Sequence, residues 1–126
     1  MGLIVLDTSV LIDHLRGDPG AVVAMSRARE AGDELCASVI TKVELLAGMR
    51  PRDRAVGALL GALDWVAVSD EIAERAGHHA RRYRASHQGI GLPDYLIGAT
   101  AEHLGATLWT RNPAFYPMLP GLRAPY

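Results

Sequence analysis

Residues 3–13, LIVLDTSVLID, contain the clearest strand-to-helix pattern of the sequence. The first four of these residues are apolar and end at Asp7, a pattern that predicts a short buried strand. Apolar residues then recur at helical spacing after Ser9, so a helix is expected to follow directly. Asp7 would therefore lie at the carboxyl end of a strand, the edge where open α/β sheets bind their ligands. The alternative is that Asp7 or Thr8 only caps the helix.

Short apolar runs continue to alternate with helical patterns along the chain. Strands are predicted at 35–38, 64–68 and 106–109, and helices at 21–31, within 38–49 behind a cap at Thr41, at 55–63, 70–87 and 92–104, with a turn at 17–20. This alternation is typical of a parallel sheet covered on both faces. No repeat or long linker divides the sequence, so we expect a single α/β domain over residues 1–126.

The composition argues against several classes of protein. The formal net charge of −1 does not by itself indicate nucleic-acid binding, which usually accompanies a basic excess. Cys36 is the single cysteine and cannot form a bridge within the chain, and its apolar neighbours predict a small buried side chain. The sequence shows no secretory leader and no apolar run of about 20 residues, so we expect a cytoplasmic protein.

The predicted helices at 38–49 and 55–63 are rich in long apolar side chains. Most of these are expected in the core, but so much apolar surface on two short helices could also leave a groove for a partner helix. Pro51 is expected to end the first of the two helices and so to form a helical hairpin. The apolar residues concerned are Leu45, Leu46, Met49, Leu59, Leu60 and Leu63.

Three acids occupy comparable positions in these predicted units. Asp7 ends the first strand, Asp94 lies in the first turn of a helix, and Glu44 is predicted in the first turn of another, with Thr41 as its capping-box partner. At Asp94 the backbone N–H groups and the helix dipole should favour the ionised carboxylate. Each acid also has a purely structural interpretation, as a turn residue, half of a capping box or a dipole partner.

Acids that converge on one crevice repel one another unless a cation lies between them. Oxygen ligands without a Cys or His cluster suit Mg²⁺ or Mn²⁺ better than zinc. Such an ion activates water as a nucleophile and offsets the charge that builds on phosphate oxygens during attack on a phosphodiester. A metal-dependent phosphodiesterase is therefore one function that this pattern indicates.

Three segments together bring a known family into view. LIVLDTSVLID, SVITKVELLAG and GLPDYLIGATAEHLGATLWTRN, in this order and at these separations, resemble the PIN-domain ribonucleases, most closely the VapC toxins of bacterial VapBC toxin–antitoxin pairs. The resemblance covers nearly the whole chain. It implies a PIN-like three-layer α/β/α sandwich and Mg²⁺- or Mn²⁺-dependent cleavage of structured RNA, such as tRNA or rRNA. It also implies a VapB-like antitoxin that covers the acids, and a homodimer.

The resemblance carries over to particular residues. Asp7, Glu44 and Asp94 match the first three family acids and would hold the metal-activated water. The family reading also favours an RNA-phosphate contact over a merely solvated face for three arginines of the predicted helix at 70–87. Those arginines are Arg75, Arg82 and Arg84.

The fourth family acid is missing from this sequence. The segment after the last predicted strand reads TRNPAFYP, in which Asn112 is the nearest polar residue and Phe115 stands where some relatives carry Asp or His. Asn112 could bind a metal or its water through the amide oxygen, and Thr110 could hold Asp7 or the same water. Both could equally serve turn formation. The resemblance thus implies a weaker second metal position.

Other functions remain open at the level of sequence. A degenerate PIN domain could bind RNA or an antitoxin without cleaving, and a cleaver of single-stranded DNA would need only a different groove. Haloacid-dehalogenase-like phosphatases also begin with a strand ending in Asp, but they need a second acid where this chain has Ser9, and Lys42 is the only lysine. The adjacent His78 and His79 should point apart on a helix and so not share an ion.

Overall fold

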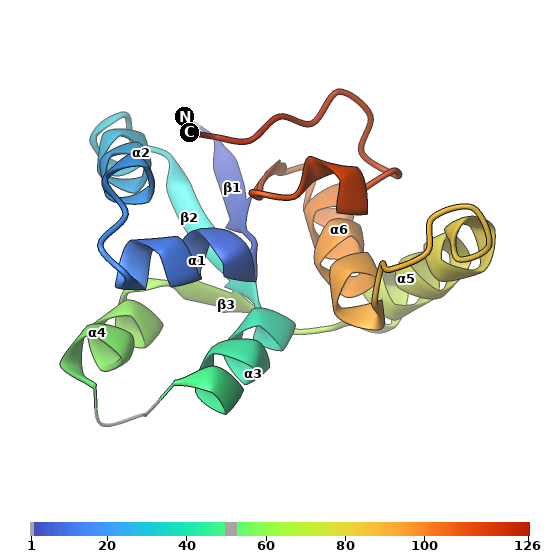
Figure 1. The fold of residues 1–126 in the computed structure, drawn as a ribbon, viewed down its shortest axis with the longest axis horizontal. Coiled ribbons are helices and arrows are strands. Elements are labelled where there is room, and N and C mark those ends of the chain that lie inside the picture. The colour runs from blue at the N-terminus through green and yellow to red at the C-terminus, as the bar shows by residue number, and fades with distance from the viewer. Residues whose placement is uncertain (1, 50–52) are drawn as a thin grey trace.

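A computed structural model describes residues 2–49 and 53–126. Four strands form one sheet in the order β3-β2-β1-β4, and every pairing is parallel (Figure 1). The strands are β1 (Leu3–Leu6), β2 (Glu34–Ser38), β3 (Asp64–Val66) and β4 (Thr107–Trp109). In β1, one of the two inner strands, Val5 pairs with Cys36 of β2 on one side and with Leu108 of β4 on the other. The predicted parallel sheet is confirmed.

Helices cover both faces of this sheet, as the sequence predicts. Side chains of the first four helices pack on one face and those of the last two on the other (Figure 1). The helices are α1 (Thr8–Leu15), α2 (Pro19–Glu30), α3 (Val39–Gly48), α4 (Arg54–Ala62), α5 (Asp70–Tyr83) and α6 (Leu92–Leu104), followed by a short 3₁₀ turn, η1 (Pro113–Phe115). The expected three-layer α/β/α sandwich is therefore confirmed.

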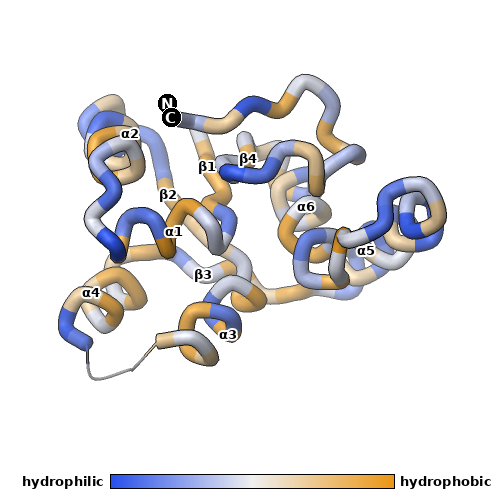
Figure 2. The backbone as a smooth tube through the Cα atoms, in the orientation of Figure 1, coloured by the Kyte–Doolittle hydropathy of each residue, from blue (hydrophilic) through white to orange (hydrophobic). Residues whose placement is uncertain are grey.

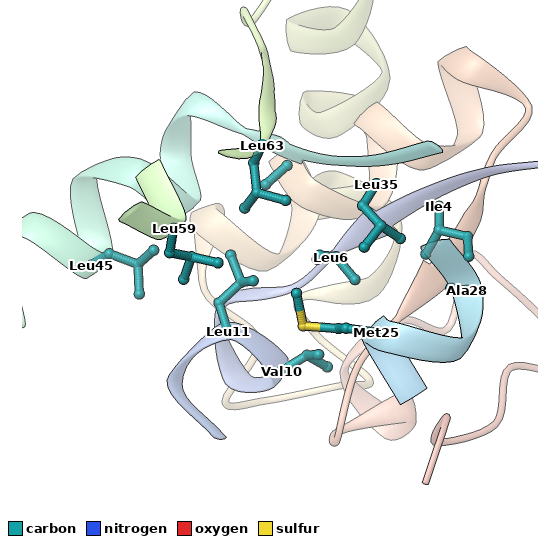
Figure 3. Packing of buried hydrophobic residues seen from close by; sticks show 11 residues of the cluster. Ile4, Leu6, Val10, Leu11, Met25, Ala28, Leu35, Leu45, Leu59 and Leu63 are labelled. Atoms are coloured by element: carbon teal, nitrogen blue, oxygen red, sulfur yellow. The ribbon is translucent and has the colours of Figure 1, made fainter. Parts of the chain in front are cut away.

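The two faces carry separate hydrophobic cores because side chains alternate along each strand. In β1, Ile4 and Leu6 point into the core shared with α1 to α4, whereas Val5 points into the core shared with α5 and α6. Figure 3 shows the first of these cores, with side chains from β1, α1, α2 and α4 converging on one another. Hydrophilic residues dominate α5, which has one face on α6 and the other in solvent (Figure 2).

Cys36 is buried, as predicted, and belongs to the second core. Burial, followed by the charges of Asp64 and Glu34, raises its pKa to about 11. Of the aliphatic residues in α3 and α4, Leu45 and Leu59 are core residues, but Leu46 is exposed. The predicted break at Pro51 lies outside the described residues. None of the described helices is both long and apolar enough to cross a membrane.

In α2, α5 and β3, one end differs from the sequence prediction by two or more residues. α2 begins at Pro19, inside the predicted turn, because the Asp18 carboxylate accepts the Ala21 N–H (3.0 Å) and a proline in the first turn needs no acceptor. α5 ends at Tyr83 and not at residue 87, since the hydroxyl and the N–H of Ser86 both donate to the Tyr83 carbonyl and close a turn. The strand predicted at 64–68 ends at residue 66.

The predicted capping box in α3 is wrong. Ser38 is the N-cap, and its hydroxyl accepts the Ile40 N–H (3.1 Å), so the helix begins three residues earlier than a cap at Thr41 would require. Glu44 is consequently the sixth helical residue and lies in the second turn. A carboxylate at that position cannot cap its own helix, which leaves the Glu44 side chain available to α1.

Candidate active site

The Asp7 carboxylate accepts three hydrogen bonds. The sequence suggested either a residue at the end of a strand or a helix cap, and Asp7 is both. It follows β1 and is also the N-cap of α1, where its Oδ1 accepts the Thr8 N–H (2.7 Å). Its Oδ2 accepts the hydroxyls of Ser9 (3.0 Å) and Thr110 (2.7 Å). Only 5% of Asp7 is exposed, and no described basic side chain pairs with it. A buried carboxylate held by neutral donors alone favours a cation beside it.

Thr110 ties the end of β4 to the end of β1. The chain places β2 and β3 on one side of β1 and β4 on the other, so Asp7 and Thr110 flank the point where the strand order reverses. Thr110 is fully buried, and its hydroxyl oxygen also accepts the Asn112 N–H (3.0 Å). The predicted contact between Thr110 and Asp7 is present. Ligands of open α/β sheets bind at such a reversal.

Glu44 is held by α1 and not by its own helix. The Thr8 hydroxyl donates to Glu44 Oε1 (2.7 Å) and lies 3.1 Å from the Thr41 hydroxyl. Because the Thr8 N–H also donates to Asp7, one residue links two of the three acids. Sequence analysis missed this role of Thr8 and Ser9, although the signal was present as two hydroxyl residues directly after Asp7.

Asp94 lies in the first turn of α6, as predicted, and its Oδ2 accepts the Gly91 N–H (3.0 Å). The Gly91 hydrogen bond favours the ionised form, as expected, but other effects outweigh it. Burial raises the pKa of the Asp94 carboxyl, and the negative charges of Asp7 and Glu44 raise it further, against the opposing effect of the Gly91 hydrogen bond. Asp7 and Glu44 therefore lie near enough to Asp94 for their charges to act on it.

The fit of a divalent cation to these acids can be judged from their surroundings. The three acids offer a metal only oxygen ligands, and none of them pairs with a described basic side chain. The pKa of Asp94 is raised in part by the negative charges of the other two. Within residues 2–49 and 53–126, however, no three Asp, Glu, His or Cys side chains stand close enough together to hold an ion as they are. The chemistry fits Mg²⁺ or Mn²⁺, but the carboxylates must move closer or bind through water.

The segment after β4 contains two predicted residues, Thr110 and Asn112, and one that sequence analysis missed. Asn112 is exposed and precedes η1, and its backbone N–H makes the contact with Thr110. Tyr116, four residues later, is buried, and its pKa is raised by burial and then by Asp7, Asp94 and Glu44. Phe115 is 40% exposed.

The three predicted RNA-binding arginines occupy different places on α5. Arg75 donates to Glu102 (3.3 Å), which His79 also contacts (2.8 Å), and Glu102 lies eight residues along α6 from Asp94. That separation is roughly 12 Å along a helix axis. Arg82 stacks on the Tyr83 ring, and Arg84 is the C-cap of α5.

Features expected of a phosphatase site are absent around Asp7 in the described part of the chain. Ser9, which stands where a second acid would be needed, donates its hydroxyl to Asp7. The Lys42 ammonium lies 4.7 Å from the centre of the Trp65 ring, so it is engaged in a cation–π contact. His79 contacts Glu102 and shares no ion site with His78 among the described residues.

Comparison with known proteins places this arrangement in context. Residues 4–118 match the model of the PIN domain. The chain is 44% identical to Ribonuclease VapC19 of Mycobacterium tuberculosis, over 96% of this chain and 98% of that protein. It is 42% identical to Ribonuclease VapC10 of the same organism, over 98% and 93% of the two chains. Among solved structures, a toxin–antitoxin complex from Klebsiella pneumoniae contains a chain that is 29% identical, with a TM-score of 0.78 and 98% coverage of both chains.

Proposed function

Because the chain belongs to the PIN-domain family, and within it to the VapC toxins, we propose that it is a metal-dependent endoribonuclease that acts as the toxin of a toxin–antitoxin pair. The observation that carries this proposal is the hydrogen-bonded arrangement at the reversal point of the sheet, where Thr110 holds Asp7 and Thr8 links Asp7 to Glu44, with Asp94 near enough to be affected by both charges. The relatives named above are ribonucleases by name, and this chain aligns with nearly their whole length.

Mg²⁺ or Mn²⁺ would be held by Asp7, Glu44 and Asp94. When bound, such an ion makes water a better nucleophile and offsets negative charge on the scissile phosphate. The protein's own contribution is to keep the carboxylates in place. Thr8, Ser9 and Thr110 orient Asp7, and Thr8 also orients Glu44.

The substrate proposed is structured RNA, either tRNA or ribosomal RNA. Arg82 and Arg84 lie at the end of α5 that leads into the first turn of α6, the turn that contains Asp94, and would contact RNA phosphates. Arg75 lies toward the other end of α6 and is bound to Glu102, so its contact with RNA would require that ion pair to open.

A VapB-like antitoxin is the proposed protein partner. The Klebsiella relative was solved as a toxin–antitoxin complex. Val43 and Leu46 of α3 are exposed apolar side chains on the same helix as Glu44, so an antitoxin segment that covers them would also lie close to this acid. We also propose that the toxin pairs as a homodimer.

The decisive experiment is cleavage of total tRNA and rRNA by purified protein with Mg²⁺, Mn²⁺ or chelator. Asp94→Asn is the site variant, and Asp70→Asn, an exposed first-turn acid of α5, is the matched control. We expect discrete fragments that require metal and Asp94 but not Asp70. Absence of cleavage with either metal, from folded protein free of antitoxin, would contradict the proposal. A single-stranded DNA arm tests the alternative substrate.

A second candidate function is binding without cleavage. It is favoured by the absence, among the described residues, of three ligands within reach of one ion, and by Asn112 in place of a fourth acid. A protein of this kind would bind RNA or an antitoxin equally well with Asp94→Asn. The cleavage experiment and a filter-binding measurement on the same variant separate the two functions.

A further inference from the structure

Tyr116 has a buried hydroxyl without a partner. The residue is 1% exposed, and its phenol oxygen makes no hydrogen bond in the structure. A buried hydroxyl without a partner costs stability, so such groups are rare in folded proteins and need an explanation. The position of the ring supplies one.

The Tyr116 ring is placed against the helix that carries Asp94. Gly98 lies four residues after Asp94 and therefore on the same face of α6. A Cβ atom at Gly98 would lie 3.1 Å from Cδ1 of the Tyr116 ring and 2.9 Å from the Met118 sulfur, so the ring rests directly on this glycine. The backbone of Tyr116 is fixed as well, since its N–H donates to Pro113 O and its carbonyl accepts the Leu119 N–H, both at 3.0 Å.

The phenol lies within range of the charges of all three acids. Asp7, Asp94 and Glu44 each raise the pKa of Tyr116, beyond the larger effect of burial. Asp7 acts on it as a nearby hydrogen-bond acceptor as well as a charge, although the pair does not form a hydrogen bond of ordinary geometry. Both Asp7 oxygens already accept hydrogen bonds from neighbouring residues.

We propose that Tyr116 is a positioning residue of the acidic site, whose O–H donates to Asp7 once the carboxylates close around a divalent ion. This inference deepens the proposed function and rests on it. No acid follows Glu102 in the sequence, and Tyr116 would add a neutral donor to the three carboxylates. The site then holds three negative charges, which favours one tightly bound ion over two.

The test is Tyr116→Phe, which removes one oxygen atom. Tyr95→Phe is the matched control, because Tyr95 is 2% exposed in the same core and its hydroxyl also lacks a partner. Affinity for Mn²⁺ alone is measured by calorimetry and thermal stability by differential scanning. Mn²⁺-induced change in the near-UV tyrosine spectrum provides a readout that a purely structural role would not alter.

We expect both variants to be at least as stable as the wild type without metal, because each loses an unpartnered hydroxyl. Tyr116→Phe should bind Mn²⁺ roughly tenfold more weakly, the factor that a hydrogen bond to a charged group provides, and should lose the Mn²⁺-induced tyrosine signal. Tyr95→Phe should retain the affinity and the signal. These results would support the inference.

The opposite outcomes are distinguishable. Unchanged Mn²⁺ affinity of Tyr116→Phe, with wild-type protein that binds Mn²⁺ and cleaves RNA, overturns the role of Tyr116 and leaves the proposed function intact. An equal loss of affinity in Tyr95→Phe also overturns it, because the effect would then arise from the core. Wild-type protein that neither binds Mn²⁺ nor cleaves RNA overturns both.

Discussion

At the scale of single residues, the site depends on hydroxyl groups as much as on carboxylates. Thr8, Ser9 and Thr110 surround Asp7 without adding charge, so the carboxylate is oriented in a nearly dry environment. The ionised form of Asp94 is less well stabilised by its surroundings, since burial and the charges of Asp7 and Glu44 raise its pKa. Function and stability therefore make opposite demands on this residue, as is common at active sites.

Thr110→Val should reduce divalent-metal affinity and cleavage by roughly 10- to 100-fold, the usual effect of losing a residue that orients a metal ligand. The substitution keeps the shape but removes the donor to Asp7 and leaves the Asn112 N–H without its acceptor. Stability should fall by about 1–3 kcal/mol. Thr100→Val is the control, because Thr100 is equally buried and its hydroxyl contacts only Leu96 O in α6. Equal losses of activity in both variants would contradict the assignment.

Asp94→Asn should abolish activity and yet stabilise the metal-free protein at neutral pH. The Asp94 pKa is raised in the folded state, so ionisation costs more in the folded than in the unfolded chain, and stability is lost as pH rises above the ordinary value of 3.8. We expect a gain of about 0.5 kcal/mol at pH 7, small because the carboxyl is only half buried. Thermal unfolding from pH 3 to pH 8 checks this. The gain in stability of Asp94→Asn should vanish near pH 3. A gain that does not depend on pH would show that it does not arise from ionisation of Asp94.

At the scale of elements, apolar patterns predicted the strands and helices, whereas local hydrogen bonds decided their ends. The run before Asp7 and the apolar spacing of α6 were sufficient to predict both elements. The start of α3 was not predictable in the same way, because Ser38 and Thr41 are equally good caps in sequence and only the packing on Thr8 distinguishes them. The candidate acids were found from their positions, but Tyr116 was not, since its role depends on a contact with Gly98 that no spacing reveals.

Ser38→Ala should destabilise the protein by about 1 kcal/mol through loss of the α3 N-cap. Because α3 carries Glu44, cleavage should also fall, by more than the loss of folded protein explains. Ser69→Ala removes the equivalent cap of α5, which carries none of the three acids, and should cost similar stability with little change in cleavage. Urea unfolding and single-turnover cleavage measure the two effects. If Thr41→Ala behaves as the cap variant and Ser38→Ala does not, the N-cap is misassigned.

At the scale of the whole molecule, the C-terminal segment fastens to the helix that follows β1. Tyr126 donates to Asp13 (2.8 Å), Arg111 donates to the same oxygen (2.6 Å), and the guanidinium lies 5.2 Å from the Tyr126 ring centre. These contacts connect the last residues to α1 and to the segment that leaves β4. The segment that contains Thr110 and Tyr116 is thereby held at its far end.

Tyr126→Phe should lower stability by about 1 kcal/mol at pH 8, because it removes the hydrogen bond to Asp13. Burial, followed by that hydrogen bond, raises the Tyr126 pKa from 10.0 to about 12. The raised pKa means that the contribution of Tyr126 is present below pH 10 and is lost as pH rises toward 12. In urea unfolding, the difference in the free energy of unfolding between variant and wild type should narrow as pH rises from 10 to 12. A constant difference would show that the hydroxyl does not titrate as proposed.

The order of the strands has a consequence for how a cell makes such a protein. Asp7 is synthesised early, but its partner Thr110 is separated from it by 103 positions and belongs to the segment that follows the last strand of the sheet. While the ribosome is still adding that segment, β1 has no β4 beside it and the carboxylate of Asp7 has no Thr110 hydroxyl to hold it. The hydrogen bond that anchors Asp7 can therefore form only after residue 110 has left the ribosome, so the acidic site is among the last parts of the fold to be completed.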